Sequence, residues 1–430
     1  MTDVHYDLFS TETRANPYVQ YAELRKHSPV HRLDEGLYLV SRYDDVRYVL
    51  MHPELFSSKA IQRMMMSGMS GMGAGIQNMA TSQAIDPKAL EALGQMSEGL
   101  GFNPAEMMTA PSVIASDPPN HERLRNIVNR GFTPRRIAAL EPRIREIAAE
   151  AADRMLEKDE FDLVADFTIP LPVRVIAELL GVTSDRFADF KRWSDGVVSG
   201  STGSASGMQP LALLGAFQEL NAYFMEQIEL RRRDPKDDLI STLIAAEEGE
   251  AALTPMEILM FAVLLLVAGN ETTTNLMGNT ILALQDEPEQ FARVQSDPSL
   301  VPALVEEGLR YDGPVQMLFR ETTQDVELAE TKIPKGSPVM AMFGSANRDE
   351  GQFPDPDRFD IDRDTRGHLA FGLGIHFCLG SSLAKLEARV GFEELFKRVS
   401  RLHPTGAEVE YVDSFLLRGP RRLMFSADRT

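Results

Sequence analysis

The feature that most constrains the fold of this chain is one long helical pattern over residues 254–285. Thr254 is the expected N-cap, Pro255 the first helical residue, and Glu257 completes a capping box. At about 1.5 Å per residue this helix is roughly 45 Å long, enough to cross a whole domain. Its longest apolar run, residues 258–269, has 12 residues, whereas a membrane span needs ~20. We therefore predict a buried central helix and no membrane span.

The rest of the pattern predicts a mainly α fold with a small β lobe. No linker divides the chain, so we expect one domain over residues 1–430. Residues 60–110 differ, because they hold nine of the 21 methionines and seven glycines. Glycine is costly to order and methionine is adaptable, so this insertion is either a substrate-access flap or a poorly ordered surface segment.

Charge and cysteine content restrict the class of protein. The net charge is −20, so the chain as a whole repels nucleic acid and anionic membranes. A single cysteine excludes an intrachain disulfide and an iron–sulfur cluster held by four cysteines of this chain. The first residues lack the basic and apolar regions of a signal peptide. We expect a cytoplasmic protein.

The strongest motif is FGLGIHFCLG, residues 371–380. Its glycines allow a tight turn and close approach to a flat partner. Cys378 directly precedes a helical segment, where backbone N–H groups and the helix dipole favour a thiolate. A thiolate binds iron, and its electron donation favours cleavage of the O–O bond. A lone cysteine is otherwise most often a small buried apolar residue.

This motif resembles the cysteine loop of the cytochrome P450 family. The resemblance implies a haem b cofactor lying between the long helix and the helix after the cysteine, with Cys378 as the axial iron ligand. The matching residues of the loop are Phe371, Gly372, Gly374, His376, Cys378 and Gly380. Of these, Phe371, His376, Cys378 and Gly380 would contact the haem.

A second motif, AGNETT, lies inside the long helix at residues 268–273. A threonine hydroxyl can bond back to the carbonyl one turn earlier and bend a helix, and an acid beside an alcohol can relay protons. By the resemblance, Glu271 and Thr272 are the catalytic pair that delivers protons during dioxygen activation, and Ala268 lies over the haem face. The family often has aspartate at the acid position, and the glutamate side chain found here is longer, so its carboxylate lies farther from the backbone.

Two further motifs concern structure and haem anchoring. Glu307 and Arg310 share one helix face and resemble the family's ExxR motif, for which Arg358 is the expected third partner in a structural triad. His121 and Arg125 also share a helix face. By the resemblance these two bind the haem propionates together with Arg320 and His376, and arginine suits carboxylates because its fork gives paired hydrogen bonds.

A basic segment indicates a protein partner. Residues 120–136 hold five arginines and one glutamate in an otherwise acidic chain, and a basic patch steers an acidic partner. No glycine-rich dinucleotide fingerprint follows a strand, so electrons must come from outside. The resemblance therefore implies a ferredoxin, with its reductase, docking near Arg123–Arg136.

The implied activity is insertion of one atom of dioxygen into a C–H bond of an apolar small molecule, by a monomer. A terpenoid, steroid, fatty acyl or aromatic substrate fits, because the expected contacts are aliphatic. These contacts are Leu264, Ala268, Val315, Met317, Leu416 and Leu417.

Three alternatives remain. A haem-thiolate peroxygenase or isomerase would work without ferredoxin, and a haem sensor would bind haem without turnover. A helical protein with a buried structural cysteine would purify colourless.

Overall fold

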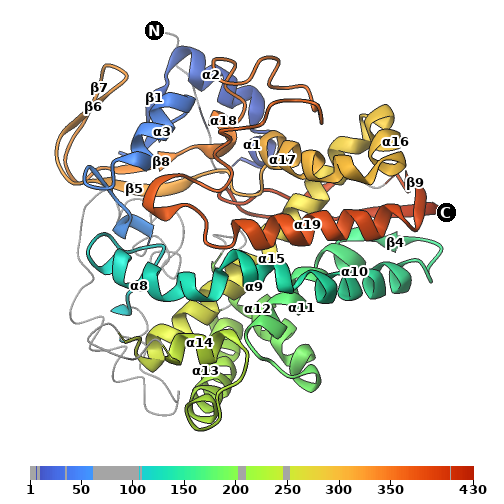
Figure 1. Ribbon diagram of the computed structural model, residues 1–430. Coiled ribbons are helices and arrows are strands. Elements are labelled where there is room, and N and C mark those ends of the chain that lie inside the picture. Colours follow the sequence, from blue (N-terminus) through green and yellow to red (C-terminus); the bar gives the residue numbers. More distant parts are fainter. Residues whose placement is uncertain are drawn as a thin grey trace.

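Helices dominate the computed structural model (Figure 1), which describes residues 6, 10–33, 36–61, 106, 109–201, 210–245, 252–406 and 408–430. Most of the Met/Gly-rich insertion predicted as a flap lies outside these residues. The α-helices are α1 (Thr11–Ala15), α2 (Tyr18–His27), α3 (Tyr43–Met51), α8 (Asn120–Val128), α9 (Pro134–Ala139), α10 (Glu141–Met155), α11 (Pro170–Leu179), α12 (Phe187–Ser201), α13 (Pro210–Arg233), α14 (Leu239–Ile244), α15 (Pro255–Gln285), α16 (Pro288–Ser296), α17 (Val301–Tyr311), α18 (Phe343–Ala346) and α19 (Ser381–Phe396).

The described strands form four small, separate sheets beside the helices, which confirms the predicted mainly α class. One sheet has the order β1-β2-β8-β5-β3, with β2 and β8 parallel and its other neighbours antiparallel; a second has the order β4-β12-β9, and β6-β7 and β10-β11 are two-stranded. The strands are β1 (Val30–Arg32), β2 (Tyr38–Val40), β3 (Phe56–Ser57), β4 (Phe161–Asp162), β5 (Leu318–Thr322), β6 (Val326–Leu328), β7 (Thr331–Ile333), β8 (Pro338–Ala341), β9 (Val399–Pro404), β10 (Glu410–Tyr411), β11 (Pro420–Arg422) and β12 (Met424–Arg429).

The long helix α15 begins as the sequence predicts. Thr254 Oγ accepts the backbone N–H of Glu257 at 3.1 Å, and the Glu257 carboxylate accepts the backbone N–H of Thr254 at 2.8 Å. The helix packs against α11, α12, α17 and α19. In length and composition α15 could cross a membrane, but 61% of its most apolar window is buried inside the fold. That burial is typical of the central helix of a core.

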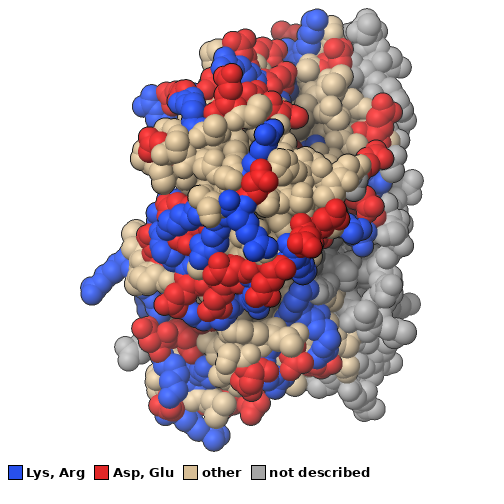
Figure 2. Space-filling model, turned by 90° about the vertical axis from the view of Figure 1, so that its right-hand side faces the viewer, with Lys and Arg blue, Asp and Glu red and all other residues tan. Residues whose placement is uncertain are grey.

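The helix that follows the cysteine is held against α10 by charged side chains as well as by packing. Arg145 of α10 binds Glu393 and Glu394 of α19, and Arg389 of α19 binds Glu141 of α10. On the face seen in Figure 2, acidic and basic side chains are intermixed and do not form one patch of a single sign. The α10–α19 pair therefore fixes where the cysteine loop joins the helical core.

Candidate cofactor and active site

The cysteine loop is a tight, hydrogen-bonded turn. Gly372 and Gly374 have φ values of 68° and 71°, which L-residues with a Cβ rarely adopt. A Cβ on Gly374 would also lie 2.6 Å from the Leu50 carbonyl oxygen. The Cys378 N–H donates to the Phe371 carbonyl at 2.9 Å, and α19 starts three residues after the cysteine. A Cβ on Gly380 would meet no atom within 4 Å, so open space lies beside the loop.

The surroundings of Cys378 have opposing effects on the pKa of its thiol. Burial raises the pKa of Cys378 above its ordinary value, while the N–H groups of Gly380 and Ser381 and the Arg125 guanidinium lower it. The helix N-terminus thus acts as the sequence predicts, but burial outweighs it in the protein alone. A further positive partner is needed to hold the thiolate, and a bound metal ion does this because a coordinating thiol is deprotonated.

Four basic side chains gather beside the loop and leave donors unused. The His121 and His376 rings lie 4.3 Å apart between centroids. His121 is buried, and within the described residues neither of its ring nitrogens has a hydrogen-bond partner. Burial lowers the pKa of Arg320 to about 10 and that of His376 to about 3. The positive charges of Arg320, His121 and Arg125 also contribute to the lowering of the His376 pKa. Buried donors without acceptors are unfavourable, so the cluster fits an anionic group.

The AGNETT segment lies on an unbroken helix. Ala268 is exposed although most of α15 is buried, so this point of the helix also borders open space. Thr272 Oγ1 donates to the Ala268 carbonyl at 2.5 Å, one turn earlier, without opening the helix. One Glu271 carboxylate oxygen is buried without a partner among the described residues, and burial raises the pKa of Glu271 to about 7. A carboxyl of that pKa exchanges protons readily at neutral pH.

The Glu307–Arg310 pair is fully buried, but its third partner differs from the prediction. Two parallel hydrogen bonds of 2.7 Å join the pair, and Arg310 also donates to the carbonyls of Asn347, Pro356 and Arg358. The Arg358 side chain is exposed, and only its carbonyl takes part. Arg363 instead places its Nε 3.4 Å from Glu307 Oε1. The prediction of Arg358 as the third partner was wrong because the chain turns at this residue and leaves its side chain exposed. The side chain of Arg363, five residues later, points back toward Glu307.

Four of the six expected substrate contacts lie together. Val315 and Leu417 form an isolated β-bridge, and the Gln316 N–H donates to the Leu416 carbonyl at 2.8 Å. Met317 and Leu416 belong to one apolar cluster of the β lobe. Leu264 and Ala268 are four residues apart on one face of α15, and no described contact joins them to the other four.

Sequence reasoning missed a buried acid on α19. Glu387 is 1% exposed, and one of its carboxylate oxygens has no partner within the described structure. Burial raises its pKa to about 8, and a hydrogen bond from Thr273 of α15 opposes that rise. The signal available in the sequence was an acidic residue between the apolar Leu386 and Ala388. In the structure the other acids of this helix, Glu393 and Glu394, are ion-paired.

A charged cluster behind Phe371 was also missed. Glu306 binds His368 Nε2 at 3.0 Å and Lys385 Nζ at 2.6 Å. Lys385 lies 5.4 Å from the centroid of the Phe371 ring, and the Phe371 carbonyl accepts the Cys378 N–H. Residues from α17, the loop and α19 thus hold the start of the cysteine loop.

Replacing Glu387 by glutamine should stabilise the protein at alkaline pH. The folded state binds this proton more tightly than the unfolded state does, so the glutamate lowers stability progressively from pH ~4.5 to ~8. Glu387→Gln should therefore add about 2 to 4 kcal/mol of unfolding free energy at pH 8 and little at pH 5, since each pKa unit corresponds to about 1.4 kcal/mol. Urea unfolding at both pH values measures this. Exposed Glu289→Gln is the control, and an equal effect at both pH values would show that Glu387 is ionised when folded.

Comparison with known proteins places this geometry in one family. The cytochrome P450 family model matches residues 213–426. The vitamin D(3) 25-hydroxylase of Pseudonocardia autotrophica is 38% identical, over 97% of this chain and 95% of its own. Two solved structures are also similar.

The structure of cytochrome P450 CYP109Q5 from Chondromyces apiculatus is 44% identical, with a TM-score of 0.83 and coverage of 99% of this chain and 98% of its own. CYP109E1 from Bacillus megaterium in complex with testosterone is 35% identical, with a TM-score of 0.79 and coverage of 96% and 99%. With the cysteine loop and the buried Glu307–Arg310 pair, these likenesses show that the chain belongs to the cytochrome P450 family of haem-thiolate monooxygenases.

Proposed function

We propose that this monooxygenase uses haem b and ferredoxin-derived electrons to hydroxylate a large apolar molecule of steroid or terpenoid size. Three observations carry the proposal: the thiol loop with free space beside Gly380, the basic cluster with its unpartnered His121 nitrogens, and the exposed Ala268 of α15. When bound, the haem supplies the activation of dioxygen. We further propose that all 430 residues form one domain, which works as a cytoplasmic monomer.

The basic cluster suits the two carboxylates of haem b. Arg125 and Arg320 bring two positive charges, and His121 and His376 bring two imidazoles that are neutral at pH 7, because burial lowers the pKa of each. Ser58 Oγ lies 2.9 Å from His376 Nε2 and orients that ring. We assign these four residues to the propionates, Cys378 to the iron, and Phe371 and Gly380 to the haem contact around the thiolate.

Glu271 and Thr272 are assigned to proton delivery. The Thr272 hydroxyl holds a proton that currently bonds the Ala268 carbonyl, and it can turn toward the open side where Ala268 is exposed. Glu271 stands next to it with a pKa of about 7, so at neutral pH it can both give up and regain a proton. Its buried position limits the entry of bulk water to this route.

An apolar substrate is supported by the lining residues. Leu264, Val315, Met317, Leu416 and Leu417 are all apolar. Arg14 and Arg418, the described cations beside the turn at Leu416 and Leu417, already pair with Asp413 and with Asp312. No described cation is thus left to anchor a charged substrate at this turn. The relative named vitamin D(3) 25-hydroxylase and the structure of CYP109E1 in complex with testosterone favour a polycyclic skeleton.

The docking surface for an acidic ferredoxin is narrower than the predicted segment. Arg123 pairs with Glu257, and Arg136 binds Thr242 and Asp237, so both side chains have intramolecular partners. Arg130 and Arg135 are exposed. Phe377, next to the cysteine, is 42% exposed, and aromatic residues are enriched in protein–protein interfaces. We assign docking to Arg130, Arg135 and Phe377.

Turnover with Thr272→Ala tests the function and the proton route together. The protein is reconstituted with a ferredoxin and its reductase, and a steroid that raises the spin state of the haem is supplied. Wild type should form hydroxylated product that carries one oxygen atom from ¹⁸O₂. Thr272→Ala should consume reductant at a similar rate while product per reductant falls roughly tenfold or more and peroxide appears, because the relay hydroxyl is gone.

Thr272→Ser keeps the hydroxyl and is the matched control, so its coupling should stay near that of wild type. Normal coupling in Thr272→Ala would remove this residue from the mechanism. Product formed with peroxide but not with reduced ferredoxin would favour the peroxygenase alternative. Haem binding without any turnover would favour a sensor.

A further inference from the structure

Backbone hydrogen bonds join the turn that carries two expected substrate contacts to residues 314–317. We call residues 413–418 the substrate turn. Its Leu417 bridges to Val315, and the Arg418 N–H donates to the Pro314 carbonyl at 2.8 Å. Within the turn, Ser414 Oγ accepts the N–H groups of Leu416 and Leu417 at 3.2 and 3.1 Å. These bonds set the local shape of the turn and its register along residues 314–317.

One residue near the N-terminus touches both ends of the substrate turn. The Arg14 guanidinium of α1 pairs with Asp413 at the start of the turn. The Arg14 carbonyl accepts a hydrogen bond of 2.6 Å from Arg418 at its end. Arg418 is itself buried and fixed by Asp312, whereas the Asp413 side chain is 32% exposed. The Arg418 end is therefore rigid, and the Arg14–Asp413 pair restrains the other end.

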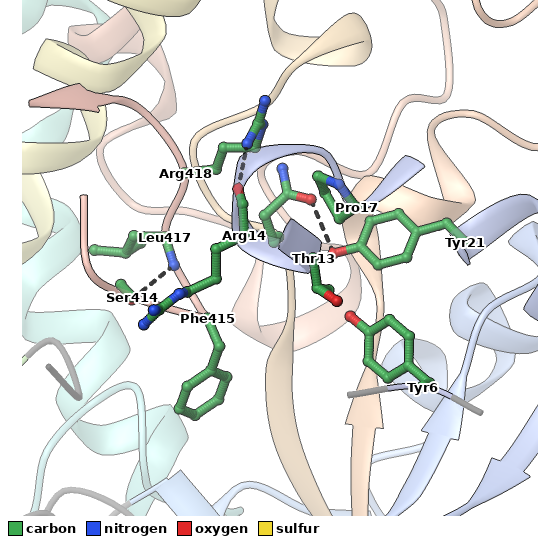
Figure 3. A pocket seen from close by; sticks show the side chains of 10 residues that line it. Tyr6, Thr13, Arg14, Pro17, Tyr21, Ser414, Phe415, Leu417 and Arg418 are labelled. Carbon is green, nitrogen blue, oxygen red and sulfur yellow. Dashed lines mark hydrogen bonds between the residues drawn. The ribbon is translucent and has the colours of Figure 1, made fainter. Parts of the chain in front are cut away.

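The side of the turn that faces α1 borders a small cavity (Figure 3). Side chains from both segments line this cavity, and several of them are polar. The cavity has a volume of only about 20 Å³, room for about one water molecule, so the side chains that line it have space for a small shift toward α1. The lining residues are Tyr6, Thr13, Arg14, Pro17, Tyr21, Gln316, Ser414, Phe415, Leu417 and Arg418.

We propose that Arg14 is a positioning residue for substrate size. Its pair with Asp413 holds the substrate turn forward, so that Leu416 and Leu417 limit the depth of the substrate pocket. Release of the pair lets the turn shift slightly toward α1, which deepens the pocket and favours bulkier molecules. This inference rests on the proposed function, because it takes Leu416 and Leu417 as walls of the substrate pocket.

Imidazoles of different size test the proposal without knowledge of the substrate. Imidazole itself and a biphenyl-substituted imidazole are titrated into the ferric holoenzyme, and the shift of the haem absorption band gives each dissociation constant. In Arg14→Gln and in Asp413→Asn, the dissociation constant of the bulky probe should fall about threefold, the scale of a partly exposed ion pair. That of imidazole should stay the same.

Two further variants separate positioning from loss of structure. The double variant Arg14→Asp/Asp413→Arg restores a pair and should return the bulky probe toward its wild-type affinity. Arg398→Gln breaks a partly exposed pair with Asp153, away from the turn, and should leave both constants unchanged. Equal shifts for both probes, or no shift for either, would overturn the proposal. Absence of the thiolate spectrum in wild type would instead count against the proposed function.

Discussion

Arg310→Met is expected to leave almost no folded, haem-loaded protein. Arg310 and Glu307 have side chains that are 0% exposed, so the substitution leaves a buried carboxylate without its charged partner. Three carbonyls, those of Asn347, Pro356 and Arg358, also lose a donor. Breaking a buried pair in this way costs about 3 to 5 kcal/mol, and a whole domain is stable by only about 5 to 15 kcal/mol.

The yield of soluble protein and the ratio of haem absorbance to protein absorbance are measured first. Urea unfolding then gives the stability of each variant that is recovered in folded form. Two matched variants test the corrected triad. Arg358→Met removes an exposed side chain and should change stability by less than about 0.5 kcal/mol. Arg363→Met removes a side chain that is 9% exposed and whose Nε lies 3.4 Å from Glu307 Oε1. Its loss of unfolding free energy should be intermediate between those of Arg358→Met and Arg310→Met. A large loss in Arg358→Met with none in Arg363→Met would contradict the structure.

Cys378→Ser should abolish the thiolate spectrum and monooxygenase activity while haem is still bound. A serine hydroxyl is far less acidic than a thiol, so it stays neutral and cannot donate electrons to iron as a thiolate does. The loop itself should persist, because the backbone N–H and carbonyl of residue 378 keep their hydrogen bonds to Phe371 and Ser381. The absorption spectrum of the reduced protein with carbon monoxide should lose its strongly red-shifted band.

Arg320→Leu is the complementary variant. It removes one proposed propionate contact on the other side of the loop, so haem should dissociate more readily while the red-shifted band remains. The two variants together distinguish ligation of the iron by Cys378 from binding of the haem propionates by Arg320. A red-shifted band retained in Cys378→Ser would mean that another residue ligates the iron, and a colourless wild type would favour a structural cysteine.

The motifs with a local physical cause could be predicted well from the sequence. Thr254 and Glu257 form a capping box using only neighbouring backbone groups, so the start of α15 follows from four residues. Gly372 and Gly374 mark a turn that their positive φ values require. Glu307 and Arg310 pair because three residues place side chains on one helix face. The two glycines and the Glu307–Arg310 pair belong to the motifs on which the P450 resemblance rests.

The tertiary structure decided what depends on distant segments. Arg363, and not Arg358, reaches Glu307, because the loop over residues 349–377 has no regular period from which a direction can be read. The net pKa shift of Cys378 comes from burial, which outweighs the helix terminus. Glu387 is a buried acid because distant elements, α15 among them, pack against α19. Sequence by itself determined the elements and motifs of this protein through short-range geometry, whereas burial and the choice of partner arise only when remote parts of the chain pack together.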